Sequence, residues 1–143
     1  DKRELFTAVR PSRLRADAVV NVVEHVTGNL PRPFERTLES TFSIDPSASQ
    51  ESLEGSLQQS LLLMNNGSFH GALAKSRVRS EAVKASSPQE TLEVLYLGTL
   101  ARKPTETERN RGLEHLKKSK NRSEGVDDLL WVLVNSTEFL TRR

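Results

Sequence analysis

The chain has 143 residues, a length that suits one domain with a hydrophobic core of its own. It contains no cysteine, which excludes disulfides, thiolate catalysis and cysteine-ligated zinc or iron–sulfur centres. Its 21 basic and 19 acidic residues nearly cancel, and the net charge of +2 gives little long-range attraction for nucleic acid. No apolar run approaches the about 20 residues that a membrane-spanning helix needs. We therefore expect no membrane span, and nucleic acid is the partner that we expect least.

The first predicted helix runs from about Arg13 to Thr27, after Pro11 and before Gly28. Its apolar face repeats at helical spacing, at Val19, Val22, Val23 and Val26. So many β-branched residues also suit a strand. We favour the helix because burying each valine, at about 1.5–3 kcal/mol, outweighs propensity penalties of about a few tenths.

The segment 29–52 is predicted to be an irregular, proline-rich connection. Pro31 and Pro33 favour extended backbone around Phe34, and residues 41–50 are rich in turn formers. So long a connection is either a packed irregular loop or a functional one.

Two further helices are predicted around a tight corner. The first carries Leu57, Leu61 and Met64 and ends at Asn65, where the following Asn-Gly tolerates a left-handed backbone. The next starts at Ser68, carries Phe69 and Leu73 on its apolar side, and fades through the basic residues 75–79.

The last third of the chain predicts three consecutive helices. Ser87 and Glu90 fit a capping box with Pro88 at the first helical position, and Thr105 and Glu108 repeat the device. The sixth helix begins near Ser123 and contains six consecutive apolar residues, 129–134, so we expect it to be buried on most sides. The sequence thus predicts an all-α fold, an irregular bundle of five or six helices forming one domain over residues 1–143.

Catalytic motifs are absent from the sequence. His25, His70 and His115 lie far apart without metal-binding spacing, and neither a nucleophilic-serine elbow nor a phosphate-binding glycine loop occurs. We therefore predict no catalytic residue, no metal site and no cofactor.

One polar stripe on the first helix has two interpretations. Asp17, Asn21 and His25 recur at i, i+4 and i+8, and an Asp–His pair can serve as a general base. The simpler interpretation, which we favour, is that the stripe is the solvent face opposite the valines. Together with Asn65 and Asn135, both at predicted helix ends, these residues define the polar groove that we predict as a binding site.

Basic clusters raise a nucleic-acid alternative. They occur at Arg10, Arg13 and Arg15, at Lys75, Arg77 and Arg79, and at Lys117, Lys118, Lys120 and Arg122. Binding to phosphates would require these clusters to converge on one face. Solvated surface charge is the favoured interpretation.

Several passages together resemble a known family. They are Pro11–Ala18 with Val26-Thr27-Gly28, Gly55–Leu61 with Met64-Asn65, Leu95-Tyr96-Leu97 with Lys103-Pro104-Thr105, Asp128–Trp131, and Asn135–Leu140. In these the chain resembles the C-terminal planctomycete domain of unknown function, although Gln58 stands where that family often has proline. The resemblance implies an extracytoplasmic location, periplasmic or at the cell surface, in a longer exported protein that often carries a cytochrome-c-like domain. It implies no reaction and no catalytic residue.

The sequence therefore predicts a non-catalytic helical interaction or structural module at the C-terminus of a larger exported protein. Its expected partner is the preceding domain of that parent chain or another protein. One alternative is part of an extracellular enzyme acting on a polymer such as polysaccharide, which would need a deep pocket lined by carboxylates or histidines. The second alternative is a nucleic-acid-binding helical domain.

Overall fold

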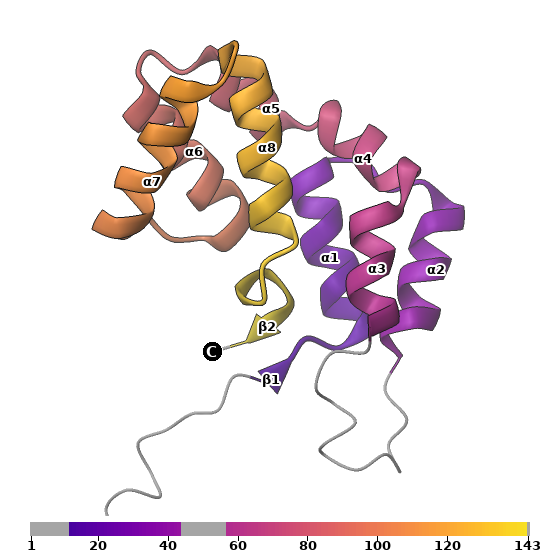
Figure 1. Ribbon diagram of the computed structural model, residues 1–143. Coiled ribbons are helices and arrows are strands. Elements are labelled where there is room, and N and C mark those ends of the chain that lie inside the picture. The colour runs from indigo at the N-terminus through magenta and orange to yellow at the C-terminus, as the bar shows by residue number, and fades with distance from the viewer. Residues whose placement is uncertain (1–11, 44–56, 143) are drawn as a thin grey trace, which may run out of the picture.

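A computed structural model describes residues 12–43 and 57–142 of the chain, and within these ranges it contains eight α-helices (Figure 1). The helices are α1 (Ala16–Thr27), α2 (Arg32–Phe42), α3 (Leu57–Asn65), α4 (Gly67–Ala74), α5 (Arg77–Lys84), α6 (Pro88–Leu100), α7 (Glu106–Lys118) and α8 (Arg122–Val134). A 3-10 helix, η3 (Glu138–Leu140), follows α8. The all-α class is confirmed, and the expected five or six helices undercounted the eight described ones.

The two ends of the described chain are joined by a short antiparallel pairing of β1 (Ser12–Arg13) with β2 (Thr141–Arg142). The amide of Leu14 extends it by donating to the carbonyl of Leu140 at 3.1 Å. Arg13, predicted as the start of the first helix, therefore lies in a strand, and α1 begins three residues later. The pairing is visible at the bottom of Figure 1.

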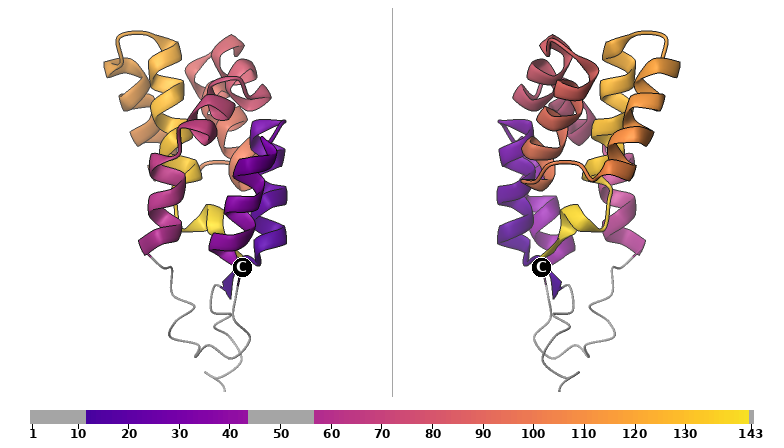
Figure 2. Two further views of the ribbon diagram at one scale, coloured as in Figure 1. Left: turned by 90° about the vertical axis from the view of Figure 1, so that its right-hand side faces the viewer. Right: turned by 90° about the vertical axis from the view of Figure 1, so that its left-hand side faces the viewer.

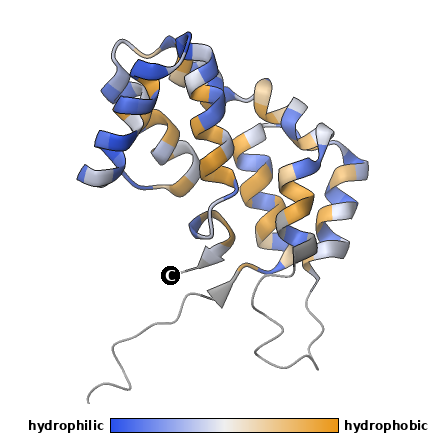
Figure 3. Ribbon diagram, viewed as in Figure 1, coloured by the Kyte–Doolittle hydropathy of each residue, from blue (hydrophilic) through white to orange (hydrophobic). Residues whose placement is uncertain are grey.

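One apolar core connects the helices. Its members come from α1 to α6, α8 and η3, and they include Val23, Leu38, Phe69, Leu95 and Val126, all fully buried. The rings of Phe34 and Phe69 lie with centroids 5.7 Å apart, which fixes α2 against α4. The views in Figure 2 show the helices gathered around this interior, and Figure 3 shows hydrophilic residues dominating α7. Accordingly, α7 stands at the periphery, with Gly112 its one fully buried residue.

Helix α2 corrects the prediction of an irregular connection over 29–52. Phe34, Leu38 and Phe42 are buried at i, i+4 and i+8, which is one stripe of a helix. Pro33 sits in the first turn, where the missing N–H would have had no helical partner in any case. Pro31, the N-cap of α2, does have the expected extended backbone, with φ of −59° and ψ of 128°, and the prediction is wrong for Pro33 and the α2 residues after it. The turn-rich part of the segment, including Asp45 and Pro46, lies outside the described residues.

A second correction concerns the basic stretch in which the third predicted helix was expected to fade. Helix α4 starts at Gly67, with Asn66 rather than Ser68 as its cap. It ends at Ala74, and α5 then starts after Ser76, whose hydroxyl accepts a hydrogen bond from the amide of Arg79 at 3.1 Å. Val78 and Ala82 turn inward, Lys75 and Arg77 are exposed, and Arg79 is partly buried against α8. The basic stretch therefore contains the N-cap of a new helix, α5, and is not a frayed end of α4.

The six consecutive apolar residues of α8 are only partly buried. Leu130, Leu133 and Val134 enter the core as expected, and α8 packs against α5, α6 and α7. Trp131 and Val132, however, are 37% and 56% exposed, so the expectation of burial on most sides was wrong for this face. None of the described helices is long and apolar enough to cross a membrane.

Candidate functional site

The candidate site is an open groove between α4 and α8, with a volume of about 280 Å³. We call it the Trp131 groove, and its lining residues are His70, Leu73, Ala74, Asp127, Asp128, Leu130 and Trp131. Apolar side chains form its floor, and the histidine and the two carboxylates supply its polar edge. This mixture of an apolar surface and a few convergent polar groups is typical of binding sites.

On the α4 side, the groove depends on the cap of that helix. The side chain of Asn66 accepts a hydrogen bond from the amide of Phe69 at 3.0 Å, which fixes the first turn. The next residue, His70, is half-buried, and its Nε2 lies 3.3 Å from the carbonyl oxygen of Leu63 in α3. The imidazole therefore ties α3 to the groove wall.

On the α8 side, Asp127 is held by an arginine from α5. Nε and Nη2 of Arg79 donate to the two carboxylate oxygens of Asp127 at 2.5 and 2.9 Å, and Nη2 also donates to the hydroxyl of Ser123 at 2.6 Å. The hydrogen bonds to Asp127 raise the pKa of Arg79 above its ordinary value. This bidentate pair joins α5 to α8 and holds the carboxylate of Asp127 in place.

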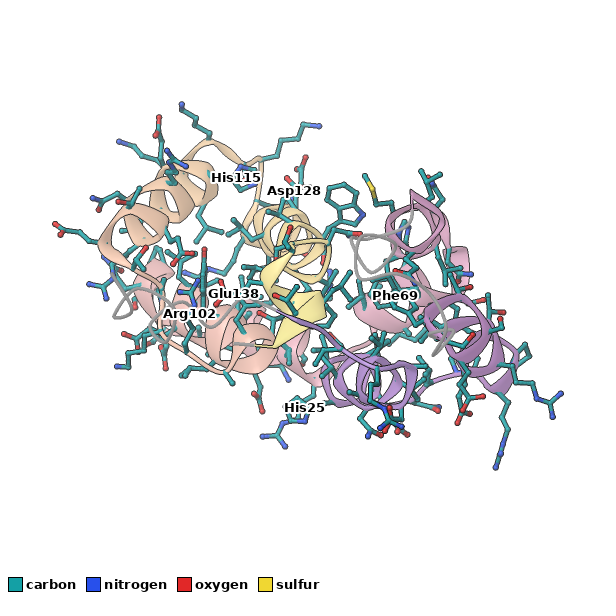
Figure 4. All side chains as sticks on the ribbon, turned by 90° about the horizontal axis from the view of Figure 1, so that it is seen from below. His25, Phe69, Arg102, His115, Asp128 and Glu138 are labelled. Atoms are coloured by element: carbon teal, nitrogen blue, oxygen red, sulfur yellow. The ribbon has the colours of Figure 1, made fainter. Side chains whose placement is uncertain are left out.

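The neighbouring carboxylate is differently placed. Oδ2 of Asp128 lies 3.1 Å from Nε2 of His115 on α7, and both side chains are about half-exposed. Figure 4 shows the two side by side. Within the described residues Oδ1 makes no hydrogen bond, so Asp128 is the acceptor that the groove offers to a ligand.

Further large apolar side chains are exposed outside the lining of the groove. Asp128, Trp131, Val132 and Asn135 share one face of α8 by their helical spacing. On α3, Leu61 and Met64 are also exposed, and Figures 1 and 2 place α3 on the same side of the molecule as α8. Large exposed apolar side chains mark a contact surface where they form a contiguous patch.

The predicted polar groove involved other residues, which the structure distributes over three helices. Asp17, Asn21 and His25 are exposed on α1, and Oδ1 of Asp17 lies 3.3 Å from Nε of Arg15. His25 lies at the opposite edge of Figure 4 from Asp128. None of the five predicted residues lines the Trp131 groove. Their role in binding therefore stays a prediction.

Asn65 and Asn135 terminate helices, as the sequence indicated. Asn65 is the exposed last residue of α3. Asn135 follows α8, and its side-chain amide donates to the carbonyl of Trp131 at 2.8 Å. Asn135 thus supplies a hydrogen-bond donor to a carbonyl in the last turn of α8, the helix that carries the groove. Of its two predicted roles, binding and helix termination, this is the simpler one.

Trp131 was not predicted as a site residue, because a tryptophan within six consecutive apolar residues is typical of a buried core position. The pairs Arg79–Asp127 and His115–Asp128 could not be predicted from the sequence either, because their members are 48 and 13 positions apart. No group of three or more metal-ligating side chains occurs within the described part of the chain.

The basic clusters do not converge in the described structure. Arg79 is engaged by Asp127 and Arg15 by Asp17, while Lys75 and Arg77 line one cavity and Lys117 and Arg122 line another. Arg10 lies outside the described residues.

A separate polar cluster lies at the turn between α6 and α7. Arg102 donates to both oxygens of Glu138, to both oxygens of Glu108 and to the carbonyl of Lys103, with all five distances between 2.7 and 3.0 Å. Its guanidinium also lies 5.4 Å from the ring centroid of Tyr96. Every N–H donor is used, so this cluster is a structural clamp rather than a ligand site.

Comparisons of the chain with known protein families, with curated proteins and with solved structures gave no match. The resemblance to the planctomycete domain accordingly stays a prediction from its motifs.

Proposed function

We propose that the protein is a non-catalytic helical interaction module, and that the Trp131 groove is its contact surface. The observation that supports this most directly is the outward placement of Trp131 and Val132 from the helix that otherwise supplies the core. Tryptophan residues at the centre of a contact surface commonly contribute most of the binding free energy.

The partner that fits this groove is a protein surface with an apolar side chain beside a basic one. The apolar side chain would cover Trp131 and the floor residues Leu73 and Leu130, removing apolar area from water. The basic side chain would meet Asp128, whose Oδ1 is unoccupied within the described structure. The preceding domain of a longer exported parent chain is the partner that the family resemblance favours.

The rigidity of the groove supports a docking role. Arg79 holds α5 to α8, and His70 connects α4 to α3, so both walls are fixed before a partner arrives. A contact surface that is ordered in advance loses less conformational entropy on binding.

A photo-crosslinking experiment tests the proposal. Val132 is replaced by p-benzoylphenylalanine, and crosslinking is carried out in the native host, with the same group at Asn21 on α1 as the control. The crosslinked partner is then purified and titrated against the unlabelled chain by calorimetry. We expect an adduct from position 132 only, and a Trp131→Ala change weakening affinity by about 30-fold or more, as for a central aromatic anchor.

Two outcomes contradict the proposal. Equal adducts from both positions would show a non-specific contact, and unchanged affinity in Trp131→Ala would remove the groove from the interface. An adduct between two copies of the chain would instead indicate self-association.

The enzyme alternative is favoured by one feature, the presence of His70, Asp127 and Asp128 in the lining. Against it, Asp127 and His70 are already engaged, and the groove is open rather than deep. An Asp128→Asn variant separates the two functions. Loss of hydrolysis of a polysaccharide supplied as substrate, with partner binding unchanged, would support the enzyme.

A further inference from the structure

A second hollow lies where α6, α7 and α8 meet, and it differs in chemistry from the Trp131 groove. Its volume is about 470 Å³. Pro88, Leu113 and Leu116 form an apolar floor, and Lys117, Asn121 and Arg122 stand around it. We call it the α7 hollow.

The walls of the α7 hollow are fixed by two close helix contacts. A Cβ on Gly112 of α7 would lie 2.6 Å from Cδ2 of Leu92 on α6, and a Cβ on Gly125 of α8 would lie 2.9 Å from Cδ2 of Leu116. Both glycines thus let α7 approach its neighbours more closely than any other residue would. The hollow is therefore part of the packed structure.

The leucines on its floor are not used by the main core. Leu113 and Leu116 are half-buried, and neither belongs to the core cluster nor packs against it. The narrow apolar stripe of α7 therefore remains partly exposed to water at this point. Covering it would be favourable at about 25 cal/mol per Å² of apolar area.

The charge around the hollow has one sign. Lys117 and Arg122 line it, and no carboxylate does. Nearby acidic groups are engaged elsewhere, Glu114 by Lys118 at 2.6 Å and Glu90 by the amide of Ser86 at 2.7 Å. The ammonium of Lys117 makes no ion pair within the described residues.

The other polar groups of the hollow already have partners. The side chain of Asn121 accepts from the amide of Glu124 at 2.9 Å, and the hydroxyl of Ser119 donates to the carbonyl of His115 at 2.8 Å. Arg122 donates one hydrogen bond to the carbonyl of Ala85 through Nη1 and keeps its remaining donors. The C-terminal end of α7, which carries a partial negative charge, and the N-terminal end of α8, which carries a partial positive charge, lie at the same hollow. Because these two partial charges oppose each other, Lys117 and Arg122 determine the electrostatic potential of the hollow.

We propose that the α7 hollow binds an acidic peptide segment of a partner protein. An apolar side chain of that segment covers Leu113 and Leu116, and an adjacent carboxylate meets Lys117 and Arg122. This surface shares α8 with the Trp131 groove but uses the start of that helix with α6 and α7, whereas the groove uses its later residues with α4. The protein would then have two docking surfaces of opposite charge preference. The proposal does not depend on the function of the Trp131 groove.

Amide chemical shifts of the ¹⁵N-labelled chain provide the test, because they detect weak binding residue by residue. The probe is a five-residue peptide of alternating leucine and glutamate with an acetylated N-terminus and an amidated C-terminus. The control is the same peptide with glutamine in place of each glutamate, which is uncharged and of the same shape. We expect the glutamate peptide to move amides in 113–122 saturably, and the glutamine peptide to bind roughly 5-fold more weakly, as expected for two partly exposed ion pairs.

Matched variants locate the contact. Lys117→Gln should weaken binding of the glutamate peptide about 2-fold to 5-fold, whereas Lys118→Gln, on the same helix but paired with Glu114, should leave it unchanged. Leu113→Ser should weaken binding too, and Leu97→Ser on the exposed side of α6 should not. The amide spectrum of each variant shows whether it is folded.

Several results would overturn the proposal. These are equal affinity of the two peptides, equal weakening by Lys117→Gln and Lys118→Gln, or shifts centred on α4. Displacement of the peptide by decanoate at lower concentration would point to a lipid anion instead, and displacement by inorganic phosphate alone would point to simple anion binding.

Discussion

Arg102 donates hydrogen bonds to both carboxylate oxygens of Glu138, at 2.8 and 2.7 Å, across 36 positions of the chain. The same guanidinium holds Glu108, so one side chain joins the α6–α7 turn, the start of α7 and η3. Figure 4 shows Arg102 and Glu138 together. Since η3 leads directly into β2, this clamp also anchors the strand that pairs with β1.

Removal of the clamp should destabilise the fold. Arg102→Ala removes four hydrogen bonds to the partly buried carboxylates of Glu108 and Glu138, and we expect the free energy of unfolding to fall by about 2 kcal/mol. Urea denaturation followed by circular dichroism measures this. Arg77→Ala is the control, because Arg77 is 85% exposed in its pair with Glu81, and it should cost less than about 0.5 kcal/mol. Equal losses in the two variants would contradict the role of the clamp.

Stability should depend on pH through Glu108. The hydrogen bonds from Arg102 lower the pKa of Glu108 to about 2 from its ordinary value of 4.5. A carboxyl whose pKa is lower in the folded state stabilises the protein above the pKa of the unfolded state. That contribution, on the order of 2 kcal/mol after allowance for solvent screening, is lost as pH falls from about 5 toward 2.

A matched variant isolates this pH effect. Glu108→Gln should be less stable than the native chain at pH 7 and should lose less stability between pH 5 and pH 2. Unfolding by urea at several pH values gives both quantities. Glu90 and Glu114 also have lowered pKa values, from hydrogen bonds with Ser86 and Lys118, so part of the acid sensitivity should remain in the variant. Parallel pH profiles for the two proteins would refute the assignment to Glu108.

The backbone at Ala101 should gain stability from glycine. Ala101 ends α6 with φ of 53°, a left-handed conformation in which a Cβ is crowded. Ala101→Gly removes that strain, although it increases the entropy of the unfolded chain. We expect a net stabilisation of about 0.5–1 kcal/mol, measured by thermal unfolding. Gly28→Ala, at φ of 77° and with open space around its Cβ, should destabilise by about 1 kcal/mol.

Gly112 should not tolerate a side chain. An alanine Cβ would lie 2.6 Å from Cδ2 of Leu92, so α7 or Leu92 must shift, at a cost of about 1–3 kcal/mol. Gly71→Ala is the opposite case, because nothing lies within 4 Å of its Cβ in α4, and alanine should stabilise the helix by about 0.5–1 kcal/mol. Chemical denaturation of both variants checks the contrast. A stabilising Gly112→Ala would show that α7 does not pack on α6 as described.

The starts of α6 and α7 show how well capping patterns in the sequence predicted the observed hydrogen bonds. Thr105 and Glu108 form the capping box that their spacing predicted, and the amide of Glu90 donates to the hydroxyl of Ser87 at 3.1 Å. The carboxylate of Glu90, however, accepts from the amide and the hydroxyl of Ser86 instead of from Ser87. The start of α6 was therefore predicted correctly, and its full capping pattern was not.

The two helices that were not predicted, α2 and α5, were missed for different reasons. Helix α2 could have been predicted from its apolar stripe, which consists of Phe34, Leu38 and Phe42 at helical spacing. It was missed because the prolines were weighed against a helix, although the first turn of a helix accepts proline. Helix α5 is short, at eight residues, and its two buried positions are too few for periodicity to identify it. Its helical form depends on packing against α6 and α8.

The sequence alone determined the all-α class and the starts of α6 and α7, and it placed the start of α8 within one residue, because capping and helical periodicity act between residues three or four positions apart. It could not determine which apolar residues of α8 would stay exposed, since a run from Leu129 to Val134 contains no information on which neighbours cover each side. Only the tertiary structure decided that Trp131 stays partly exposed beside α4 and that α7 leaves Leu113 and Leu116 half-buried. The positions of Arg79 and Arg102 were decided in the same way, because their ion pairs join residues brought together by packing of the core.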